Sequence, residues 1–165
     1  SAGPVFFRQE RAGKNGRYFR IFKFRSMAVD PDAEKKGFEP GSKMRVTSIG
    51  RILRKTKLDE LPQLLNVIKG EMSIVGPRPE VRRYIELYPE RWAKVLSIAP
   101  GITDPGSIEF RNEEEILAAA SDPEKEYTEK LLPAKLDLYE KYADSISFLS
   151  DIKIIAKTAA AVIFK

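Results

Sequence analysis

Sequence typical of β-strands is concentrated at the start of this chain. Two segments, 5–11 and 17–27, are rich in Phe, Val, Ile and Tyr, and the run Gly13-Lys14-Asn15-Gly16 separates them. Strand-like segments joined by such a turn form an antiparallel hairpin. From Thr47 onward most segments carry apolar residues at helical spacing instead. The pattern therefore limits the fold to a mainly helical domain built on a small β-hairpin.

The remaining elements follow from local signals. Helices are predicted from Thr47 through Leu53, over 58–68 with an end at Lys69-Gly70, over 80–88, over 89–98, from Asn112 through Glu115, from Asp122-Pro123 toward Tyr142 with a kink at Pro133, and over 147–165. A turn-rich connector over 100–106 leads into a short strand over 108–110, and the charged segment 28–45 is a long loop. The predicted class is α+β, one domain over 1–165, with a small N-terminal sheet and a C-terminal amphipathic helix.

Composition restricts the chemistry. The 165 residues, 42% of them hydrophobic, suffice for one domain with a core. The chain has no cysteine and no histidine. This excludes disulfides, thiolate metal sites, a thiol nucleophile and the commonest general base. Any catalysis depends on carboxylates, lysines, tyrosines or hydroxyls.

The charge favours anionic partners. Lys and Arg number 29 against 24 Asp and Glu, a net charge of +5, which suits nucleotides, nucleic acid or an anionic membrane surface. No apolar run is long enough to span a membrane. In the last segment one helical face gathers Phe148, Ile152, Ile155, Ala159, Val162 and Ile163, whereas Lys153 and Lys157 lie on another side. Two interpretations stay open, a helix packed on the core and an interfacial helix with its lysines toward lipid headgroups.

Two adjacent carboxylates, Asp59 and Glu60, stand at the head of the apolar helix over 58–68. A basic cluster precedes them: Arg51, Arg54, Lys55 and Lys57. Downstream, Gly76-Pro77-Arg78-Pro79 places another guanidinium on stiff backbone. Capping explains the pair without function, either through a Thr56-x-x-Asp59 capping box or with Asp59 as the N-cap. The second carboxylate and the four cations favour chemistry on a phosphate, with Mg²⁺ between carboxylates and phosphate.

Six blocks, in order, resemble the bacterial sugar transferase family, the small monotopic phosphoglycosyl transferases. They are Gly3-Pro4-Val5-Phe6-Phe7-Arg8-Gln9, Lys23-Phe24-Arg25-Ser26-Met27, Leu58-Asp59-Glu60-Leu61-Pro62-Gln63, Lys69-Gly70-Glu71-Met72-Ser73, Gly76-Pro77-Arg78-Pro79-Glu80 and Pro100-Gly101-Ile102-Thr103. Each block alone is weak evidence. Together, at compatible spacing over nearly the whole chain, they make the resemblance strong.

The resemblance implies transfer of a sugar 1-phosphate from a UDP-sugar to polyprenyl (undecaprenyl) phosphate, with release of UMP. It implies the first step of surface polysaccharide synthesis, such as lipopolysaccharide or capsule, at the cytoplasmic face of the bacterial inner membrane. It assigns Asp59 as the nucleophile that forms a covalent phosphosugar intermediate and Glu60 as its partner. Both carboxylates are expected to bind Mg²⁺, with covalent catalysis in two steps.

The resemblance also assigns phosphate-binding roles to Lys23, Arg54, Arg78 and, with weaker correspondence, Arg111. Each has a structural alternative. Lys23 would be an outward strand residue and Arg54 an exposed helix charge. Arg78 would be a turn residue paired with Glu80, and Arg111 would pair with Glu113 or Glu114 on a solvated face.

Two departures from the family pattern affect these expectations. Family members carry a hydrophobic re-entrant helix before the Gly-Pro-Val-Phe-Phe block, whereas this sequence begins at Ser1, so the anchor helix is expected to be absent from this chain. Asp104-Pro105-Gly106-Ser107 stands where many relatives have Gly-Trp-Ala-Gln. The sugar pocket is therefore expected to differ, and the donor sugar does not transfer from those relatives.

Two other functions are compatible with parts of the sequence. A non-catalytic basic module binding nucleic acid or anionic lipid would use the aromatic and cationic residues interleaved over 18–25. That module leaves the Asp59-Glu60 pair unexplained, so no nucleic acid partner is expected. A family relic that binds nucleotide-sugar without meeting a lipid acceptor is the other alternative.

Overall fold

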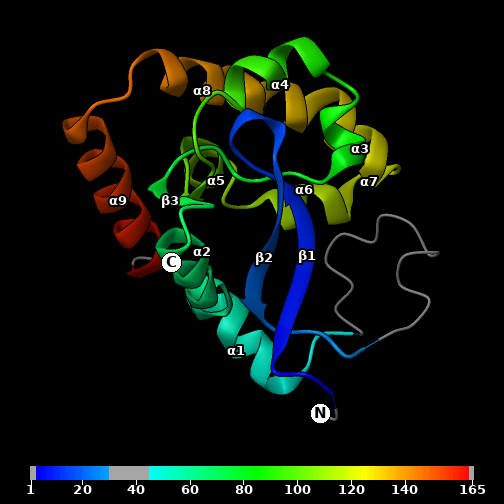
Figure 1. Ribbon diagram of the computed structural model, residues 1–165. Coiled ribbons are helices and arrows are strands. Elements are labelled where there is room, and N and C mark those ends of the chain that lie inside the picture. The colour runs from blue at the N-terminus through cyan, green and yellow to red at the C-terminus, as the bar shows by residue number, and fades with distance from the viewer. Residues whose placement is uncertain (1–2, 30–44, 164–165) are drawn as a thin grey trace.

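The computed structural model describes residues 3–29 and 45–163 (Figure 1). The strands are β1 Phe6–Ala12, β2 Tyr18–Phe24, β3 Ser73–Val75 and β4 Gly101–Thr103. The α-helices are α1 Ser48–Thr56, α2 Leu64–Ile68, α3 Arg82–Ile85, α4 Pro89–Val95, α5 Pro105–Glu109, α6 Glu113–Ala119, α7 Pro123–Glu126, α8 Leu132–Asp144 and α9 Phe148–Ile163. Two 3₁₀ segments, η1 Lys14–Gly16 and η2 Leu58–Gln63, and a π-turn, η3 Tyr127–Leu131, complete them. The mainly helical α+β class is confirmed; the predicted loop over 28–45 lies largely outside the described residues.

The predicted hairpin is confirmed. β1 and β2 pair antiparallel from Phe6 opposite Phe24 to Ala12 opposite Tyr18, and they form the long blue ribbon of Figure 1. The turn needs positive φ at Asn15 (56°) and Gly16 (72°), which these two residue types tolerate best. The hairpin carries Lys23 near one end and places it over the segment that follows α1.

The main core lies between the helices of the second half of the chain. Trp92 of α4 and Tyr139, Leu132 and Leu136 of α8 are at most 1% exposed, and side chains of α3, α6 and η3 pack around them. A smaller cluster of Phe19, Ile21 and Met72 seals the hairpin onto the rest of the domain. The helical core therefore forms a support on which the hairpin and the α1–α2 region rest.

The strand predicted over 108–110 is wrong. Residues Pro105–Glu109 form α5, and the strand lies earlier, where β4 pairs parallel with β3. The helix begins there because Asp104 accepts a hydrogen bond from the Ser107 N–H (2.7 Å) and Pro105 occupies the first turn. A Cβ on Gly101 would lie 2.1 Å from the Gly76 nitrogen, so the approach of these two backbones requires glycine.

Most of the other predicted helices begin where expected. α1 is capped by Thr47, α4 begins at Pro89, and α7 follows Asp122, whose side chain accepts from the Lys125 N–H (2.9 Å). α3 is shorter than the predicted 80–88. The irregularity expected at Pro133 is the π-turn just before it. α6 follows Asn112, although that side chain makes no capping hydrogen bond.

The predicted C-terminal helix is α9, which packs beside β3, β4 and α5. Asp151 accepts a hydrogen bond from the Tyr142 hydroxyl (2.7 Å), and the Thr158 and Thr103 hydroxyls are bonded to each other. Phe148 and Leu149 at its start are 79% and 77% exposed. α9 therefore packs on the domain along one side and leaves apolar residues in solvent on another. None of the helices described within 3–29 and 45–163 is both long and apolar enough to cross a bilayer.

Candidate active site

The carboxylate pair lies in a 3₁₀ segment between two α-helices. α1 ends where Lys57 adopts a left-handed conformation (φ 58°), and η2 and α2 follow, so the single helix predicted over 58–68 has two parts. The capping box is wrong, because the Thr56 hydroxyl donates to the Ile52 carbonyl instead (2.9 Å). Asp59 is also not the N-cap, since Lys57 occupies that position without a side-chain cap. Helix capping therefore does not account for the pair.

α1 is held tightly against the chain before it. The Thr47 hydroxyl accepts from the Gly50 N–H (2.9 Å), and the Thr47 N–H donates to the Ser26 carbonyl (3.0 Å). A Cβ on Gly50 would lie 1.9 Å from the Ser26 oxygen. Only glycine allows α1 to lie against this backbone. That contact fixes the position of α1, and with it the positions of Arg54 and of η2, which follows α1.

Glu60 is clamped by two cations. Its Oε1 accepts from the Lys23 ammonium (2.7 Å) and from the Arg78 guanidinium (2.6 Å). Burial alone would raise the pKa of Glu60, but the charges and hydrogen bonds of Arg78 and Lys23 outweigh it and hold the pKa far below its usual value. Glu60 therefore stays ionised, and it holds Lys23 and Arg78, two of the predicted phosphate-binding residues, next to each other.

Lys23 lies close to the charge of Arg78, and its side chain is largely buried. Burial lowers the pKa of Lys23 to about 8, the nearby positive charge of Arg78 acts in the same direction, and Glu60 opposes both. The alternative of an outward strand residue is wrong, because this side chain is only 18% exposed and ion-paired. Lys23 is thus charged near neutral pH and loses its proton more readily than an ordinary lysine.

Asp59 differs from its neighbour. Its Oδ1 is buried and has no hydrogen-bond partner. Burial raises the pKa of Asp59, the charge of Glu60 raises it further, and Lys23, Lys57 and Arg54 partly compensate. A buried carboxylate oxygen without a donor is costly in a folded protein. Among the described residues, Asp59 is therefore the member of the pair whose carboxylate is not committed to an ion pair or hydrogen bond.

Arg78 faces Glu60 rather than Glu80. The predicted alternative, a pair between Arg78 and Glu80, is wrong because Glu80 lies in the interior. There it accepts from the Tyr127 hydroxyl (2.7 Å) and pairs with Arg11 (3.3 Å). Arg78 and Glu80, which alternate with two prolines, thus point to different places: Arg78 lies against the carboxylate pair and Glu80 lies in the core.

Arg54 and Arg111 have different environments. The Arg54 guanidinium is ion-paired with Glu114 of α6, sixty positions along the chain, and its charge reaches Asp59. Arg111 is exposed and has no ion pair or hydrogen bond with another described residue. The alternative that paired it with Glu113 or Glu114 is wrong, because Glu113 binds Lys135 instead. Lys23 and Arg78 thus bind Glu60, and the charge of Arg54 acts on Asp59, whereas no ion pair or hydrogen bond among the described residues joins Arg111 to the pair.

Two further polar residues lie near the pair, and the sequence motifs contain both without assigning either one a role of its own. Gln63, one turn beyond Glu60, is 1% exposed and its Nε2 has no hydrogen-bond partner. Asp104 is fully buried, and its charge adds to that of Glu60 in raising the pKa of Arg78. The signals were present, since Gln63 belongs to the same sequence block as the pair and Asp104 precedes a proline with Ser107 at capping distance.

A cation would find few protein ligands here. Within the described ranges no three Asp, Glu, His or Cys side chains cluster at metal-binding distance. Mg²⁺ is commonly held by one or two carboxylates with substrate phosphate and water. The orphaned Oδ1 of Asp59 fits that use, whereas Oε1 of Glu60 is already occupied by Lys23 and Arg78.

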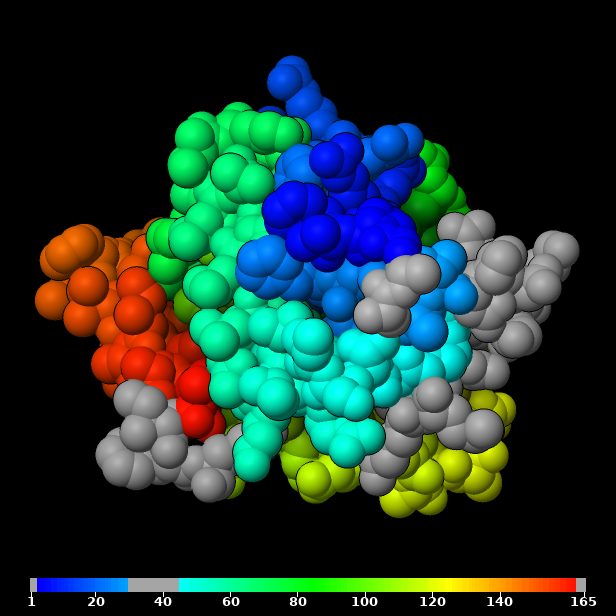
Figure 2. Space-filling model, turned by 90° about the horizontal axis from the view of Figure 1, so that it is seen from below, coloured from blue at the N-terminus to red at the C-terminus, as the bar shows by residue number. Residues whose placement is uncertain are grey.

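An exposed apolar surface surrounds the site. We call it the apolar face; it consists of Ile49, Ile52, Leu58, Leu61, Leu64, Leu65 and Ile68, each 43% to 82% exposed. Figure 2 shows the α1–α2 region that carries it across the centre of one side of the molecule, beside the start of the hairpin. Contiguous apolar patches of this kind indicate a membrane or partner surface. The residues of η2 contribute both to this face and to the carboxylate pair.

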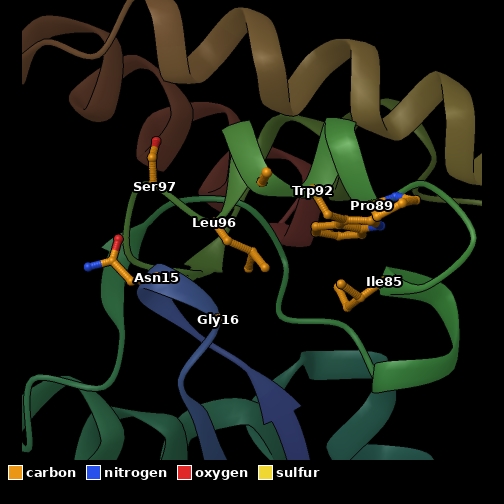
Figure 3. Close-up of a pocket in the computed structure, with 8 residues that line it drawn as sticks. Asn15, Gly16, Ile85, Pro89, Trp92, Leu96 and Ser97 are labelled. Carbon is orange, nitrogen blue, oxygen red and sulfur yellow. The ribbon is translucent and has the colours of Figure 1, made fainter.

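Two hollows lie away from the pair. One, of about 400 Å³, is bordered by Trp92, Leu96 and the hairpin turn (Figure 3). The other, of about 740 Å³, lies between the start of the hairpin and α1. Neither is lined by a predicted site residue. The candidate active site is the region around η2, which lines neither hollow.

Comparison with known proteins gives consistent matches. The profile of the family described as bacterial sugar transferase matches residues 1–165. The chain is 41% identical over 160 residues to the uncharacterized sugar transferase EpsL of Bacillus subtilis (strain 168), covering 97% of this chain and 70% of that protein. It is 40% identical over 172 residues to the galactosyl transferase CpsE of Streptococcus agalactiae, covering 98% of this chain and 35% of that protein. It is 38% identical over 169 residues to the UDP-glucose:undecaprenyl-phosphate glucose-1-phosphate transferase of Xanthomonas campestris, covering 99% of this chain and 32% of that protein.

Proposed function

Because the chain belongs to the bacterial sugar transferase family, we propose that it transfers a sugar 1-phosphate from a UDP-sugar to a polyprenyl phosphate. The relative from Xanthomonas campestris is named for such a transfer to undecaprenyl phosphate. Within this chain, one observation carries the proposal: Asp59 presents a buried, unpaired oxygen beside a carboxylate that fixes two cations.

The first step is attack on the donor by Asp59. A carboxylate oxygen of Asp59 forms a bond to the β-phosphorus of the UDP-sugar, and the bond from that phosphorus to the bridging oxygen breaks. The electron pair leaves with UMP, and the phosphosugar stays on the enzyme. The raised pKa of Asp59 supports this role, since a more basic carboxylate is a better nucleophile.

The second step regenerates the enzyme. A phosphate oxygen of the polyprenyl phosphate attacks the same phosphorus, and the bond between phosphorus and Asp59 breaks. The products are a polyprenyl diphosphate sugar and the free carboxylate. Lys23 and Arg78, held by Glu60, offset negative charge on the phosphoryl oxygens in both steps.

Mg²⁺ is the proposed cofactor. The unpaired Oδ1 of Asp59 is the protein oxygen best suited to hold it, with Glu60 beside it. When bound, the ion supplies positive charge that lowers the repulsion between a carboxylate and a diphosphate. Lys23, Arg54 and Arg78 supply the remaining positive charge from the protein itself.

The apolar face is the proposed membrane surface. A polyprenyl chain remains in the bilayer, so its phosphate must be met at the lipid interface. η2 carries both Asp59 and exposed leucines, which supports a site that opens at that interface. Exposed Phe148 and Leu149 of α9 favour the interfacial interpretation of the C-terminal helix. Phe19 and Ile21, in contrast, are buried, which disfavours a nucleic acid stacking surface on the hairpin.

Release of UMP tests the reaction order. The full-length protein in lipid is mixed with a panel of UDP-sugars and Mg²⁺ without acceptor. We expect a burst of about one UMP per active site with the correct donor, and continued turnover only after polyprenyl phosphate is added. UMP release that depends strictly on acceptor would contradict the two-step proposal.

A further inference from the structure

Glu114 is the one carboxylate among the described residues that ion-pairs with Arg54. It comes from α6, whose position follows the stretch in which this sequence departs from the family pattern. Arg54 belongs to the last turn of α1, five residues before Asp59. The contact therefore joins the active-site segment to the helical core across sixty positions of sequence.

The helix turn that carries Glu114 is anchored to the core. Its neighbour Glu113 binds the Lys135 ammonium, and the Lys135 side chain is only 4% exposed. Lys135 also lies over the Tyr127 ring at 5.3 Å from its centre. The first turn of α6 is thus held to α8 by one glutamate, while the next glutamate reaches outward to Arg54.

Among the described residues, the contact occupies only part of the guanidinium. An arginine has five N–H donors in a planar fork, and Glu114 binds at Nη2. The remaining donors can meet a phosphate oxygen while Glu114 still holds Nη2. A flexible arginine side chain loses considerable rotamer freedom when it is ordered, so ordering it before the substrate binds lowers the cost of binding.

We infer that Glu114 is a positioning residue, which orients Arg54 so that its free N–H donors face the diphosphate beside Asp59. This inference rests on the proposed function. The pair contributes little to the stability of the fold, because Glu114 is 66% exposed and exposed ion pairs contribute little to folding. It is also the opposite of a blocking role, in which Glu114 would compete with the donor for Arg54.

The chain provides a matched control. Glu115 is the next residue of the same turn and is exposed, and its side chain makes no ion pair or hydrogen bond with another described residue. Glu114→Gln and Glu115→Gln remove the same charge from the same helix end. Any general effect of charge on donor attraction is therefore common to both variants, and only the first releases Arg54.

The test is a double-variant cycle in the full-length protein in lipid. The variants are Glu114→Gln, Glu115→Gln, Arg54→Lys, and Arg54→Lys with Glu114→Gln. We expect Glu114→Gln to raise KM for the UDP-sugar and to lower kcat/KM by about fivefold to tenfold, with an unchanged unfolding temperature. Glu115→Gln should stay within about twofold of the parent. In the Arg54→Lys background, adding Glu114→Gln should change kcat/KM by less than about twofold, because the guanidinium that Glu114 orients is no longer present.

Three results would overturn the inference: equal effects of the Glu114 and Glu115 changes, a lower KM in Glu114→Gln, or full additivity with Arg54→Lys. Failure of the proposed function is recognised separately. In that case Asp59→Asn would turn over like the parent protein. Loss of activity in Asp59→Asn and Arg54→Lys, with no specific effect at Glu114, would reject only the positioning role.

Discussion

The protonation state of Lys23 predicts an alkaline limit to activity. Lys23 must be charged to offset phosphate charge, and burial with the neighbouring Arg78 lowers its pKa from 10.5 to about 8. That fall corresponds to about 3 kcal/mol against the charged ammonium. At pH 9 only about one Lys23 in ten keeps its proton. We therefore expect kcat/KM to fall about tenfold for each pH unit above about 8.

The same residue predicts the opposite trend in stability, which separates the two effects. Between pH 8 and pH 10.5 the unfolded chain binds more protons at Lys23 than the folded chain does. The contribution of Lys23 to the free energy of unfolding therefore increases with pH over that range. Loss of activity just above pH 8 should occur without a corresponding loss of fold at this residue, as thermal unfolding at each pH would show.

The assay is the pH dependence of kcat/KM for UMP release, measured for the parent protein and for Lys23→Arg. Arginine keeps its charge throughout this range, so the variant should lose the alkaline fall, although its overall rate will be lower. On the acid side, the raised pKa of Asp59 predicts that activity declines at a higher pH than for an ordinary aspartate. An alkaline fall at the same pH in Lys23→Arg would refute the assignment.

Three further predictions concern the scaffold and the surface. Gly50→Ala should lower the unfolding temperature and the yield of folded protein, since its Cβ would lie 1.9 Å from the Ser26 oxygen; unchanged melting would contradict the tight contact. Asn66→Ala should lower the free energy of unfolding by about 2–4 kcal/mol, as denaturant unfolding would show. This fully buried side chain forms hydrogen bonds with the backbone of Arg20 and Phe22 in β2 and with the Glu71 carboxylate just after α2; a loss below about 1 kcal/mol would contradict the importance of these bonds. Ile68→Ser should weaken binding to anionic vesicles without changing melting, whereas Leu87→Ser, at an exposed position between α3 and α4, should bind like the parent; equal binding of both variants would reject the apolar face.

Local signals were sufficient for much of the fold. The turn residues and the flanking aromatics predicted the hairpin, and the caps at Thr47 and Asp122 predicted helix starts that the structure confirms. The failed strand over 108–110 has a local cause as well. Asp104-Pro105 begins α5 by the same chemistry as Asp122-Pro123 begins α7, whereas Ile108 and Phe110, on either side of Glu109, alternate as in a strand.

The site depended on contacts that no local pattern contains. The proximity of Lys23 and Arg78 to Glu60 needs the hairpin, η2 and the end of β3 to meet, at separations of 37 and 18 residues. The Arg54–Glu114 pair spans sixty. The difference within the pair, in which Glu60 binds two cations and the Oδ1 of Asp59 has no partner, arises from these contacts and not from spacing. The sequence blocks therefore indicated the residues and, through the resemblance, their proposed roles, whereas the contacts among these residues follow only from the packing.

The direct test of the central proposal is the mass of the protein itself during turnover. The full-length protein is incubated with UDP-sugar and Mg²⁺ without acceptor, quenched, and analysed as intact protein and as peptides. We predict an added sugar phosphate localised to Asp59, lost when polyprenyl phosphate is supplied and absent from Asp59→Asn. Turnover by Asp59→Asn, or an adduct located on another residue, would contradict the account.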